Sequence, residues 1–404
     1  MHLSRIYLNY FRNIESATID FGRGVNILWG DNAQGKSNVL EAIYFCARGK
    51  SFRGAHEKQL ITHDKEFSAF RAEFYKTDAD RMSTLAFTLS RSGKKVMLRD
   101  EVEEKSLVNM VGRLHAVMFT PQHLTLVTGS PAERREFMNI AISLCYPPYI
   151  RALATYNRTL EERNALLRQT ALSGEKPRYD LFEIFAQSLA EAAAAVVTCR
   201  ADFVRKTNVF ARQQLSSLSR GMDYLSLSYI PRGAAEEAGA DPVAEEGKNA
   251  VLTDALGADG KIGPDGGKAD VYTAAMQSLL MSDLPREIAA KTTLYGPHRD
   301  DIGISLNGRS ARSFASQGQT RSIALALKMA EGQLMHRMLG ERPVYLLDDV
   351  LSELDEGRRE FLLTELRHEQ IILTSCEPDF RIRDFEPFSH ITRLHVQKGK
   401  IKEM

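Results

Sequence analysis

The chain of 404 residues contains no uninterrupted apolar run of 18 residues. Its first five residues, Met-His-Leu-Ser-Arg, lead into an alternating pattern and not into a charged segment followed by an apolar core. A membrane-spanning helix needs about 20 apolar residues, and an export signal needs the charged-then-apolar order. We therefore expect no membrane partner, no export and a cytoplasmic location.

Cysteine is scarce, and the four cysteines lie far apart without a Cys-x-x-Cys pair: Cys46, Cys145, Cys199 and Cys376. Disulfide frameworks and zinc sites need more cysteines at closer spacing. We expect neither, and a reduced cellular setting follows.

An excess of charge is also absent, because 53 basic residues accompany 52 acidic ones and the net charge is +1. Nucleic-acid binding needs a local basic patch and not a basic total, so the balance neither demands nor excludes a polyanionic partner. The hydrophobic content of 43% is enough for a sizeable core, and the length allows two or three domains.

A glycine-rich loop lies between a predicted strand at 25–29 and a predicted helix that starts at Lys36. The loop reads Gly30-Asp31-Asn32-Ala33-Gln34-Gly35-Lys36-Ser37 and fits G-x-x-x-x-G-K-[ST]. In this pattern the glycines let backbone N–H groups curl around phosphates, and the helix N-terminus adds positive potential. Lys36 is predicted to reach the β and γ phosphates of a nucleotide, and Ser37 to place its hydroxyl on Mg²⁺.

A second apolar strand, predicted at 344–347, ends in Asp348 and Asp349. A P-loop fold places a magnesium-binding acid at the end of such a strand. Asp348 is the expected Mg²⁺ contact, through water. Asp349 is predicted to orient or deprotonate the attacking water, although aspartate is one methylene shorter than glutamate.

The middle of the chain is rich in predicted helix. Leu153, Leu160 and Leu167 repeat every seven residues and predict a short coiled-coil seam, and a second long helix is predicted at 179–217. Turn residues at 173–177 separate the two helices. We predict an antiparallel hairpin that projects as an arm, with a plain helical subdomain as the alternative.

The segment 233–268 contains eight glycines and eight acidic residues with few large apolar ones. Its apolar surface is too small to offset the entropy of ordering the chain. We predict a flexible insertion there.

The tetrapeptide Ser316-Gln317-Gly318-Gln319 precedes a helix predicted at 319–338. Ser316 suits a helix N-cap, and Gly318 leaves backbone amides accessible. Taken alone, this pattern fits either an anion-binding helix start or an ordinary capped helix.

Together these motifs resemble the ATP-binding-cassette class, and within it the head domains shared by SMC, Rad50 and RecF proteins. The resemblance runs in order through Tyr10-Phe11-Arg12-Asn13, Gly30 to Asn38 with Leu40-Glu41-Ala42-Ile43, Ser316 to Gln319, and Leu347 to Asp355. The RecF family is the most similar, because only about 170 residues separate the head halves. Further RecF-like stretches are Phe119-Thr120-Pro121, Gly129-Ser130-Pro131 with Arg134-Arg135, Asn164-Ala165-Leu166-Leu167, and Gly296 to Asp301.

This resemblance implies an α/β fold, an ABC-type (SMC/Rad50-like) P-loop ATPase head with an inserted α-helical arm domain. The head halves are expected at 1–118 and 284–404, and the helical arm at 119–224. A strand, the insertion and a helix are expected at 225–283.

The resemblance also implies which residues act together. The ATP-binding set would be Gly30, Asp31, Asn32, Ala33, Gln34, Gly35, Lys36, Ser37 and Asn38, with Mg²⁺ on Ser37 and Asp348. Ser316, Gln317, Gly318 and Gln319 would cap the ATP of a second copy of the chain, with Ser352 and Asp355 at the dimer interface. Gln122 would join Asp349 as a catalytic residue.

The activity implied by the resemblance is weak DNA-dependent ATP hydrolysis in an ATP-dependent homodimer. The implied partners are duplex or gapped DNA and a RecR-type mediator, in loading RecA during replication, repair and the SOS response. A transporter-type ATPase subunit and a non-hydrolysing, ATP-dependent DNA scaffold are the alternatives.

Three positions depart from the pattern of the resembled proteins. Ala33 replaces a common glycine, which is tolerable if its φ is negative. Gln317 stands where transporter cassettes carry glycine, and Thr374-Ser375 follows the predicted strand at 371–373 without the usual histidine. We therefore expect slow hydrolysis that times the release of DNA.

The residues that contact DNA are not determined by the sequence. Three basic clusters are candidates for phosphate contacts: Arg134-Arg135; Arg91, Lys94, Lys95 and Arg99; and Lys398, Lys400 and Lys402. Such a cluster is more often a solvated charged surface than a DNA contact.

Overall fold

The computed structural model describes residues 1–174, 176–231, 252, 267–377 and 390–403. Within these residues the chain forms two compact units. Unit 1 consists of Met1–Val127, Gln213–Asp223 and Ser316–Met404, and unit 2 of Thr128–Arg212 and Tyr224–Ala315. Almost all of the predicted insertion at 233–268 lies outside the described residues.

This division differs from the boundaries expected at residues 119, 225 and 284. The segment from 284 to 315 belongs to unit 2 because its strand β10 (Asp301–Leu306) pairs with β9 (Leu225–Ile230). Helix α7 (Leu284–Ala290) of the same segment packs on the helices of that unit. The second half of unit 1 therefore starts at Ser316.

The core of unit 1 is a six-stranded sheet in the order β15-β14-β3-β13-β12-β8. Its strands are β3 (Val25–Trp29), β8 (Ala116–Phe119), β12 (Val344–Leu347), β13 (Gln370–Ser375), β14 (Ile391–Gln397) and β15 (Lys400–Glu403). All neighbours pair in parallel except β14 and β15. The apolar strands predicted at 25–29, 344–347 and 371–373 are confirmed, and their continuous hydrophobic character fits burial on both faces.

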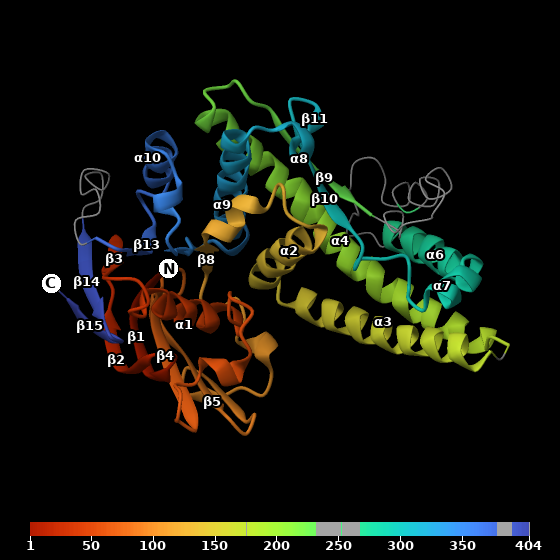
Figure 1. Ribbon diagram of the computed structural model, residues 1–404, viewed down its shortest axis with the longest axis horizontal. Helices are drawn as coiled ribbons and strands as arrows, with labels where there is room; N and C mark the ends of the chain where they lie inside the picture. Colours follow the sequence, from red (N-terminus) through yellow and green to blue (C-terminus); the bar gives the residue numbers. More distant parts are fainter. Residues whose placement is uncertain (175, 232–251, 253–266, 378–389, 404) are drawn as a thin grey trace. The chain divides into compact units, whose positions relative to one another are not determined.

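A second sheet of unit 1 is antiparallel, in the order β2-β1-β4-β5-β6-β7. Its strands are β1 (His2–Phe11), β2 (Ile14–Asp20), β4 (Phe67–Lys76), β5 (Arg81–Ser90), β6 (Lys95–Arg99) and β7 (Val102–Glu103). Helix α1 (Lys36–Arg48) lies between the two sheets (Figure 1). Its Phe45 packs edge-on against Phe70 and Phe87, at ring-centroid distances of 5.2 and 5.3 Å.

Helices α9 (Gln317–Leu339) and α10 (Glu356–Glu365) lie on the other side of the parallel sheet (Figure 1). The helix predicted at 319–338 is thereby confirmed. At Gly332 of α9, a Cβ atom would stand 1.8 Å from the hydroxyl oxygen of Tyr345 in β12. Only glycine lets α9 come this close to the strand that carries the acidic pair.

Short 3₁₀ helices complete unit 1: η1 (Glu57–Leu60), η2 (Leu107–Asn109), η3 (Pro121–Thr125) and η4 (Leu351–Glu353).

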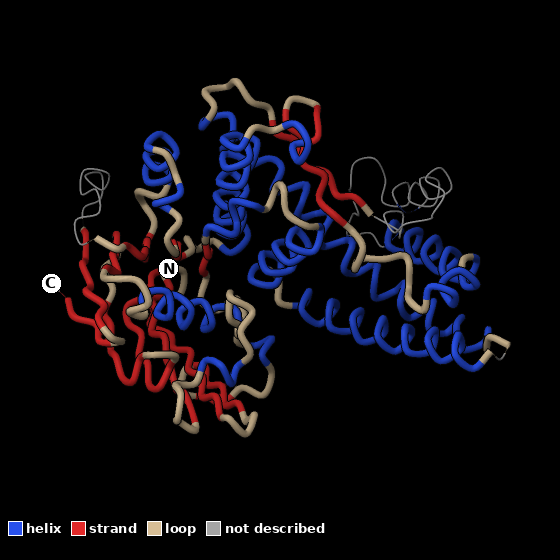
Figure 2. The backbone as a smooth tube through the Cα atoms, in the orientation of Figure 1, coloured by secondary structure: helices blue, strands red, loops and turns tan. Residues whose placement is uncertain are grey.

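Unit 2 is mostly helical and carries one small sheet in the order β11-β10-β9 (Figure 2). Its remaining elements are α2 (Pro131–Cys145), α3 (Pro148–Ser173), α4 (Tyr179–Leu218, which continues into unit 1), α6 (Gly267–Ser282), α8 (Ala311–Phe314) and β11 (Arg309–Ser310). Near the turn between α3 and α4, Leu167 clusters with Phe182. At the far end, Arg200 of α4 donates to the Tyr149 hydroxyl of α3. The two helices are therefore antiparallel, as predicted.

The leucine pattern predicted along α3 describes the packed face only in part. Leu167 is fully buried against Phe182, whereas Leu153 and Leu160 are only half-buried. Tyr149, Tyr156 and Arg163 are buried at the same seven-residue spacing. This face makes polar contacts: Tyr156 hydrogen-bonds to His298, and Arg163 forms a buried ion pair with Glu287. A hydrophobic-repeat rule cannot detect such a face, because tyrosine and arginine do not count as seam residues.

The stretch Gly296–Asp301 joins the helices of unit 2. Asp301 forms an ion pair with Arg134 of α2, with Nε and Oδ1 2.7 Å apart, and the Asp300 carbonyl accepts from Arg135 at 2.9 Å. Both groups of the Arg134–Asp301 pair are buried, so Arg134 is not available as a phosphate contact. Burial lowers the pKa of His298 to about 4, which keeps this residue neutral.

Among the described helices, α4 is long and apolar enough to cross a bilayer by length and composition. The core helix of a protein meets the same criterion, and Phe182, Leu189 and Val196 of α4 are fully buried within the protein. The helix also carries the buried Arg200. This feature is weak evidence for a membrane span.

The Arg163–Glu287 pair provides a test of unit 2. Arg163→Ala leaves the Glu287 carboxylate buried without its cation, and burial already raises the pKa of Glu287. We expect a loss of about 3–5 kcal/mol of unfolding free energy, measured by urea titration followed by circular dichroism. Arg168→Ala removes an exposed arginine of the same helix and should change stability by less than about 0.5 kcal/mol. Equal effects of the two changes would contradict this interpretation.

Candidate functional site

The loop between β3 and α1 is shaped by residues with positive φ. Gly30 has φ +146° and Gly35 has φ +113°, and neither position has room for a side chain. A Cβ on Gly30 would lie 2.3 Å from the Val396 carbonyl oxygen, and one on Gly35 would lie 2.7 Å from Asn13 Oδ1. The two glycines of the motif are thus required by close approach as well as by backbone conformation.

Lys36 is almost fully buried at the start of α1. It donates to the carbonyl oxygens of Gly30 at 2.5 Å and Asp31 at 2.8 Å. The loop therefore wraps around the lysine at the first turn of α1.

Ala33 has φ +64°, in the left-handed region, so the condition of a negative φ, under which alanine would be tolerated without strain, is not met. A non-glycine residue in this region costs about 1–2 kcal/mol. The backbone at this position therefore has a conformation that glycine would adopt without strain, although the residue is alanine.

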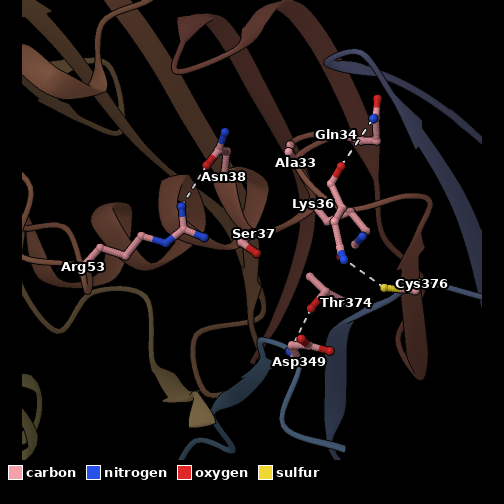
Figure 3. A pocket seen from close by; sticks show the side chains of 11 residues that line it. Ala33, Gln34, Lys36, Ser37, Asn38, Arg53, Asp349, Thr374 and Cys376 are labelled. Atoms are coloured by element: carbon pink, nitrogen blue, oxygen red, sulfur yellow. Dashed lines mark hydrogen bonds between the residues drawn. The ribbon is translucent and has the colours of Figure 1, made fainter. Parts of the chain in front are cut away.

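A polar cavity of about 180 Å³ opens in front of this loop (Figure 3). Residues from four separate segments line it: Asn32, Ala33, Gln34, Gly35, Lys36, Ser37, Asn38, Arg53, Asp349, Thr374 and Cys376. The segments meet because β3, β12 and β13 are parallel neighbours and all end at this edge of the sheet.

Thr374, at the end of β13, links the two aspartates after β12. Its hydroxyl donates to Asp348 Oδ1 at 3.1 Å and accepts from the backbone N–H of Asp349 at 2.9 Å. The sequence alone indicates only that a histidine is missing here. The structure shows a threonine that fixes the positions of both acids.

Asp349 itself lines the cavity and has φ +55°, a conformation that aspartate tolerates better than most residues. The Ser352 hydroxyl is 2.7 Å from the Asp349 carbonyl oxygen and 3.1 Å from its Oδ1. Asp348 lies behind it and is nearly buried.

Arg53 also lines the cavity, although no sequence motif indicates it. It follows α1 in a loop without a recognisable motif, and its guanidinium donates to Asn38 Oδ1 at 3.0 Å (Figure 3). The same group lies 3.8 Å from Asp348 Oδ2. Arg53 thus brings a positive charge opposite the acidic pair, across the entrance to the loop.

Glu41 explains two of the shorter motifs. Its fully buried carboxylate accepts two hydrogen bonds from Arg12, at 2.9 and 2.8 Å, and one from the Ser51 hydroxyl. This contact fastens the turn between β1 and β2 to helix α1. Asn13 in the same turn then donates to the Gln34 carbonyl of the loop at 3.1 Å.

Ser316 caps helix α9, as expected. Its hydroxyl accepts from the Gln319 N–H at 3.2 Å, while Gln319 Oε1 accepts from the Ser316 N–H at 3.0 Å. Arg358 donates to the Gly318 carbonyl at 2.7 Å. None of the four residues Ser316 to Gln319 lines the cavity formed by the described part of the same chain.

Three other predicted residues also lie on the surface outside this cavity. Gln122 is exposed on η3 and does not line the cavity. Ser352 and Asp355 are exposed, and Asp355 caps α10 by accepting from the Arg358 N–H at 3.0 Å. Because Arg358 also contacts Gly318, the segment around Asp355 is linked directly to the start of α9.

The candidate DNA contacts differ in their availability. In the cluster of Arg91, Lys94, Lys95 and Arg99, Lys95 pairs with Glu57 at 2.6 Å and Arg99 pairs with Glu104 at 2.7 Å. Arg91 donates to backbone carbonyls, and Lys94 is exposed. Lys398, Lys400 and Lys402 are exposed and have no ion pair within the described residues.

All four cysteines are free, and the described residues contain no group of three or more His, Cys, Asp or Glu side chains placed to hold a metal ion.

The strain at Ala33 can be tested directly. Ala33→Gly removes a Cβ from a left-handed residue, and this gain exceeds the added entropy of the unfolded chain. We expect about 0.5–1 kcal/mol of added stability in urea unfolding. Ala154→Gly, in the exposed middle of α3, should instead cost about 1 kcal/mol. Loss of stability in both variants would refute the assignment of strain to Ala33.

Comparisons with known proteins agree with this geometry. The family model described as RecF/RecN/SMC N terminal domain matches residues 2–397. The proteins named DNA replication and repair protein RecF from Halalkalibacterium halodurans and Listeria monocytogenes are both 34% identical to the chain, over 404 and 405 residues. Each alignment covers 100% of both proteins.

Solved structures give the same result. Structures of the recombination mediator protein RecF-ATPrS and RecF-ATP in the RecFOR pathway match with TM-scores of 0.83 and 0.82 at 28% identity. They cover 100% of this chain and 98% and 97% of those chains. The Smc head domain from Pyrococcus furiosus matches with a TM-score of 0.52 at 14% identity, over 100% of this chain and 96% of that one, which supports the fold alone. The expected α/β head of SMC-like type is confirmed, and the chain belongs to the RecF family.

Proposed function

We propose that the chain is an ATP-dependent DNA-binding protein of recombinational repair. It dimerises on ATP, binds duplex or gapped DNA, hydrolyses ATP slowly and helps a RecR-type mediator to load RecA, in the cytoplasm, during replication, repair and the SOS response. One observation carries most weight. The cavity joins a phosphate-binding loop to a fixed acidic pair, but the chain's own Ser316–Gln319 helix start lies outside it.

The residues of the cavity fit the triphosphate of ATP. The curved loop exposes backbone N–H groups at the start of α1, where the helix dipole favours anions. Lys36 and Arg53 supply positive charge on two sides of the cavity. The carbonyl contacts of Lys36 hold its ammonium in the loop, within reach of phosphate oxygens.

The residues also fit Mg²⁺, which takes oxygen ligands and keeps several waters. Ser37 lines the cavity with its hydroxyl, and the Asp348 carboxylate stands behind Thr374 as a ligand that acts through water. Bound there, Mg²⁺ would neutralise phosphate charge. Asp349 lines the cavity and is the group placed to orient or accept a proton from a water.

The small size of the cavity supports a site completed by a second copy. Ligand pockets usually enclose about 300–1,000 Å³, and this one offers about 180 Å³. Ser316 and Gln317 are exposed at the start of α9, and a helix N-terminus suits anion binding across a two-fold dimer. Ser352 and Asp355 lie on the surface linked to this helix start through Arg358.

Slow hydrolysis follows from the chemistry around Asp349. Aspartate reaches less far than glutamate, and the Ser352 hydroxyl occupies part of its hydrogen-bonding capacity. Gln122 stays a candidate for sensing the nucleotide, since η3 directly follows β8 beside the acidic strand. ATP is therefore proposed to time DNA release, in preference to a non-hydrolysing scaffold or a transporter subunit.

The role of Thr374 distinguishes hydrolysis from a scaffold. Thr374→Val removes the hydroxyl that fixes both acids, so we expect ATP hydrolysis to slow by roughly tenfold or more while ATP binding changes little. Phosphate release and binding of a fluorescent ATP analogue measure the two effects. Thr374→Ser keeps the hydroxyl and should retain most of the activity. An unchanged rate in the valine variant would argue against hydrolysis at this site.

The shared site predicts a common defect in two distant variants. Lys36→Met removes phosphate binding, and Ser316→Arg places a bulky cation at the exposed helix start. We expect both to lose the ATP-dependent dimer in size-exclusion chromatography with light scattering, and DNA affinity to fall in parallel. Ser316→Ala, which truncates the cap without blocking the surface, should keep partial dimerisation. A wild-type chain that stays monomeric in saturating ATP would exclude the shared site.

A further inference from the structure

The hairpin at the end of the parallel sheet turns at Lys398 and Gly399. Both residues have positive φ, +49° and +73°. A two-residue turn with positive φ at both positions favours Asn-Gly or Asp-Gly, because a lysine in the left-handed region is strained. This turn nevertheless carries a lysine at its tip.

The turn is fastened to the phosphate-binding loop through Gln34. The Lys398 N–H donates to Gln34 Oε1 at 2.7 Å, and the Gly399 N–H donates to the Gln34 carbonyl at 3.0 Å. A Cβ on Gly399 would lie 2.2 Å from the Asn13 carbonyl oxygen, so only glycine permits this approach. Gln34 lines the cavity, and one residue therefore contacts both the site and the hairpin.

The hairpin is also a surface of unpaired positive charge. Lys398, Lys400 and Lys402 are exposed, and no ion pair involves them within the described residues. Lys400 and Lys402 stand opposite Gln397 and His395 and so share one face of β15, whereas Glu403 stands on the other. Two residues of a strand advance about 6.6–6.8 Å. Successive phosphates of one DNA strand rise about 3.4 Å along the helix axis, and two flexible lysine side chains on one face of the strand can contact two phosphates of the same backbone.

We propose that this hairpin, residues 397–402, binds the phosphate backbone of DNA and that Gln34 couples its position to the nucleotide. The inference rests on the proposed function and names a surface through which ATP acts on DNA. Phosphates held by the loop fix its backbone N–H groups, and hence Gln34 and the turn. By linkage, DNA on the hairpin strengthens nucleotide binding by the same factor.

The double variant Lys400→Gln/Lys402→Gln tests the surface. With ATP present, the dependence of log affinity on log salt should become shallower by about 1.8, because two phosphate contacts are lost. Lowering the salt concentration from 200 to 50 mM should therefore raise the DNA affinity of the variant by roughly tenfold less than that of the wild type. The control Lys58→Gln/Lys105→Gln removes two exposed lysines of the same unit and should leave the slope unchanged. Equal slopes for both double variants would overturn the proposal.

Gln34→Ala tests the coupling, since it removes the Oε1 acceptor and keeps the backbone carbonyl. At ATP concentrations that saturate the variant, the ratio of DNA affinities with and without ATP should fall toward one. In the wild type, duplex DNA should tighten binding of a fluorescent ATP analogue, and in the double lysine variant it should not. A Gln34→Ala protein with the full wild-type ratio would refute the coupling.

The outcomes separate this proposal from the proposed function. A wild-type protein that binds no DNA at any ATP concentration would overturn both. A wild-type protein that binds DNA with ATP, together with a double lysine variant that matches its control, would overturn the hairpin proposal alone. Light scattering confirms that each variant keeps its ATP-dependent dimer before the DNA titrations are compared.

Discussion

The close approach of backbone segments around the loop at 30–36 is the constraint on which the site depends. Gly30, Gly35 and Gly399 stand where a Cβ atom would lie 2.2–2.7 Å from a neighbouring oxygen. Through these contacts the loop packs closely against the turn after β1 and the hairpin of β14 and β15. Since the loop cannot relax, Lys36 stays inside it, and the ends of β12 and β13 bring the acids and Thr374 to the same cavity. The shape of the site is therefore set by segments that are far apart in sequence.

Much of this arrangement could be predicted from sequence. The loop motif, the apolar strand before Asp348 and the capped helix at Ser316 are local patterns. A local pattern is enough to predict an element that a single segment of the chain forms by itself. Thr374 and Arg53 could not be predicted as partners, because their roles arise only when neighbouring strands and a loop meet. Ala33 shows the converse, since its φ is imposed by the loop and not by its own preference.

The leucine pattern of α3 identified only part of the packed face, for a different reason. The face that packs in unit 2 carries Tyr156 and Arg163, whose partners His298 and Glu287 lie more than a hundred residues away. His298 belongs to the stretch Gly296–Asp301, whose Asp300 and Asp301 contact Arg135 and Arg134 of α2, so this stretch contributes to the packing of unit 2. Buried polar contacts of this kind fix one arrangement of the helices, because an unmatched charge in the core is costly.

In the proposed dimer, two copies of the chain share each nucleotide site. Mixing Lys36→Met with Ser316→Arg, two variants expected to be inactive alone, and measuring ATP hydrolysis tests this sharing. A mixed dimer contains one site with both defects and one intact site, so hydrolysis should reappear at up to about a quarter of the wild-type rate. A mixture that stays inactive, or a Ser316→Arg protein that hydrolyses ATP at the wild-type rate by itself, would contradict the shared site.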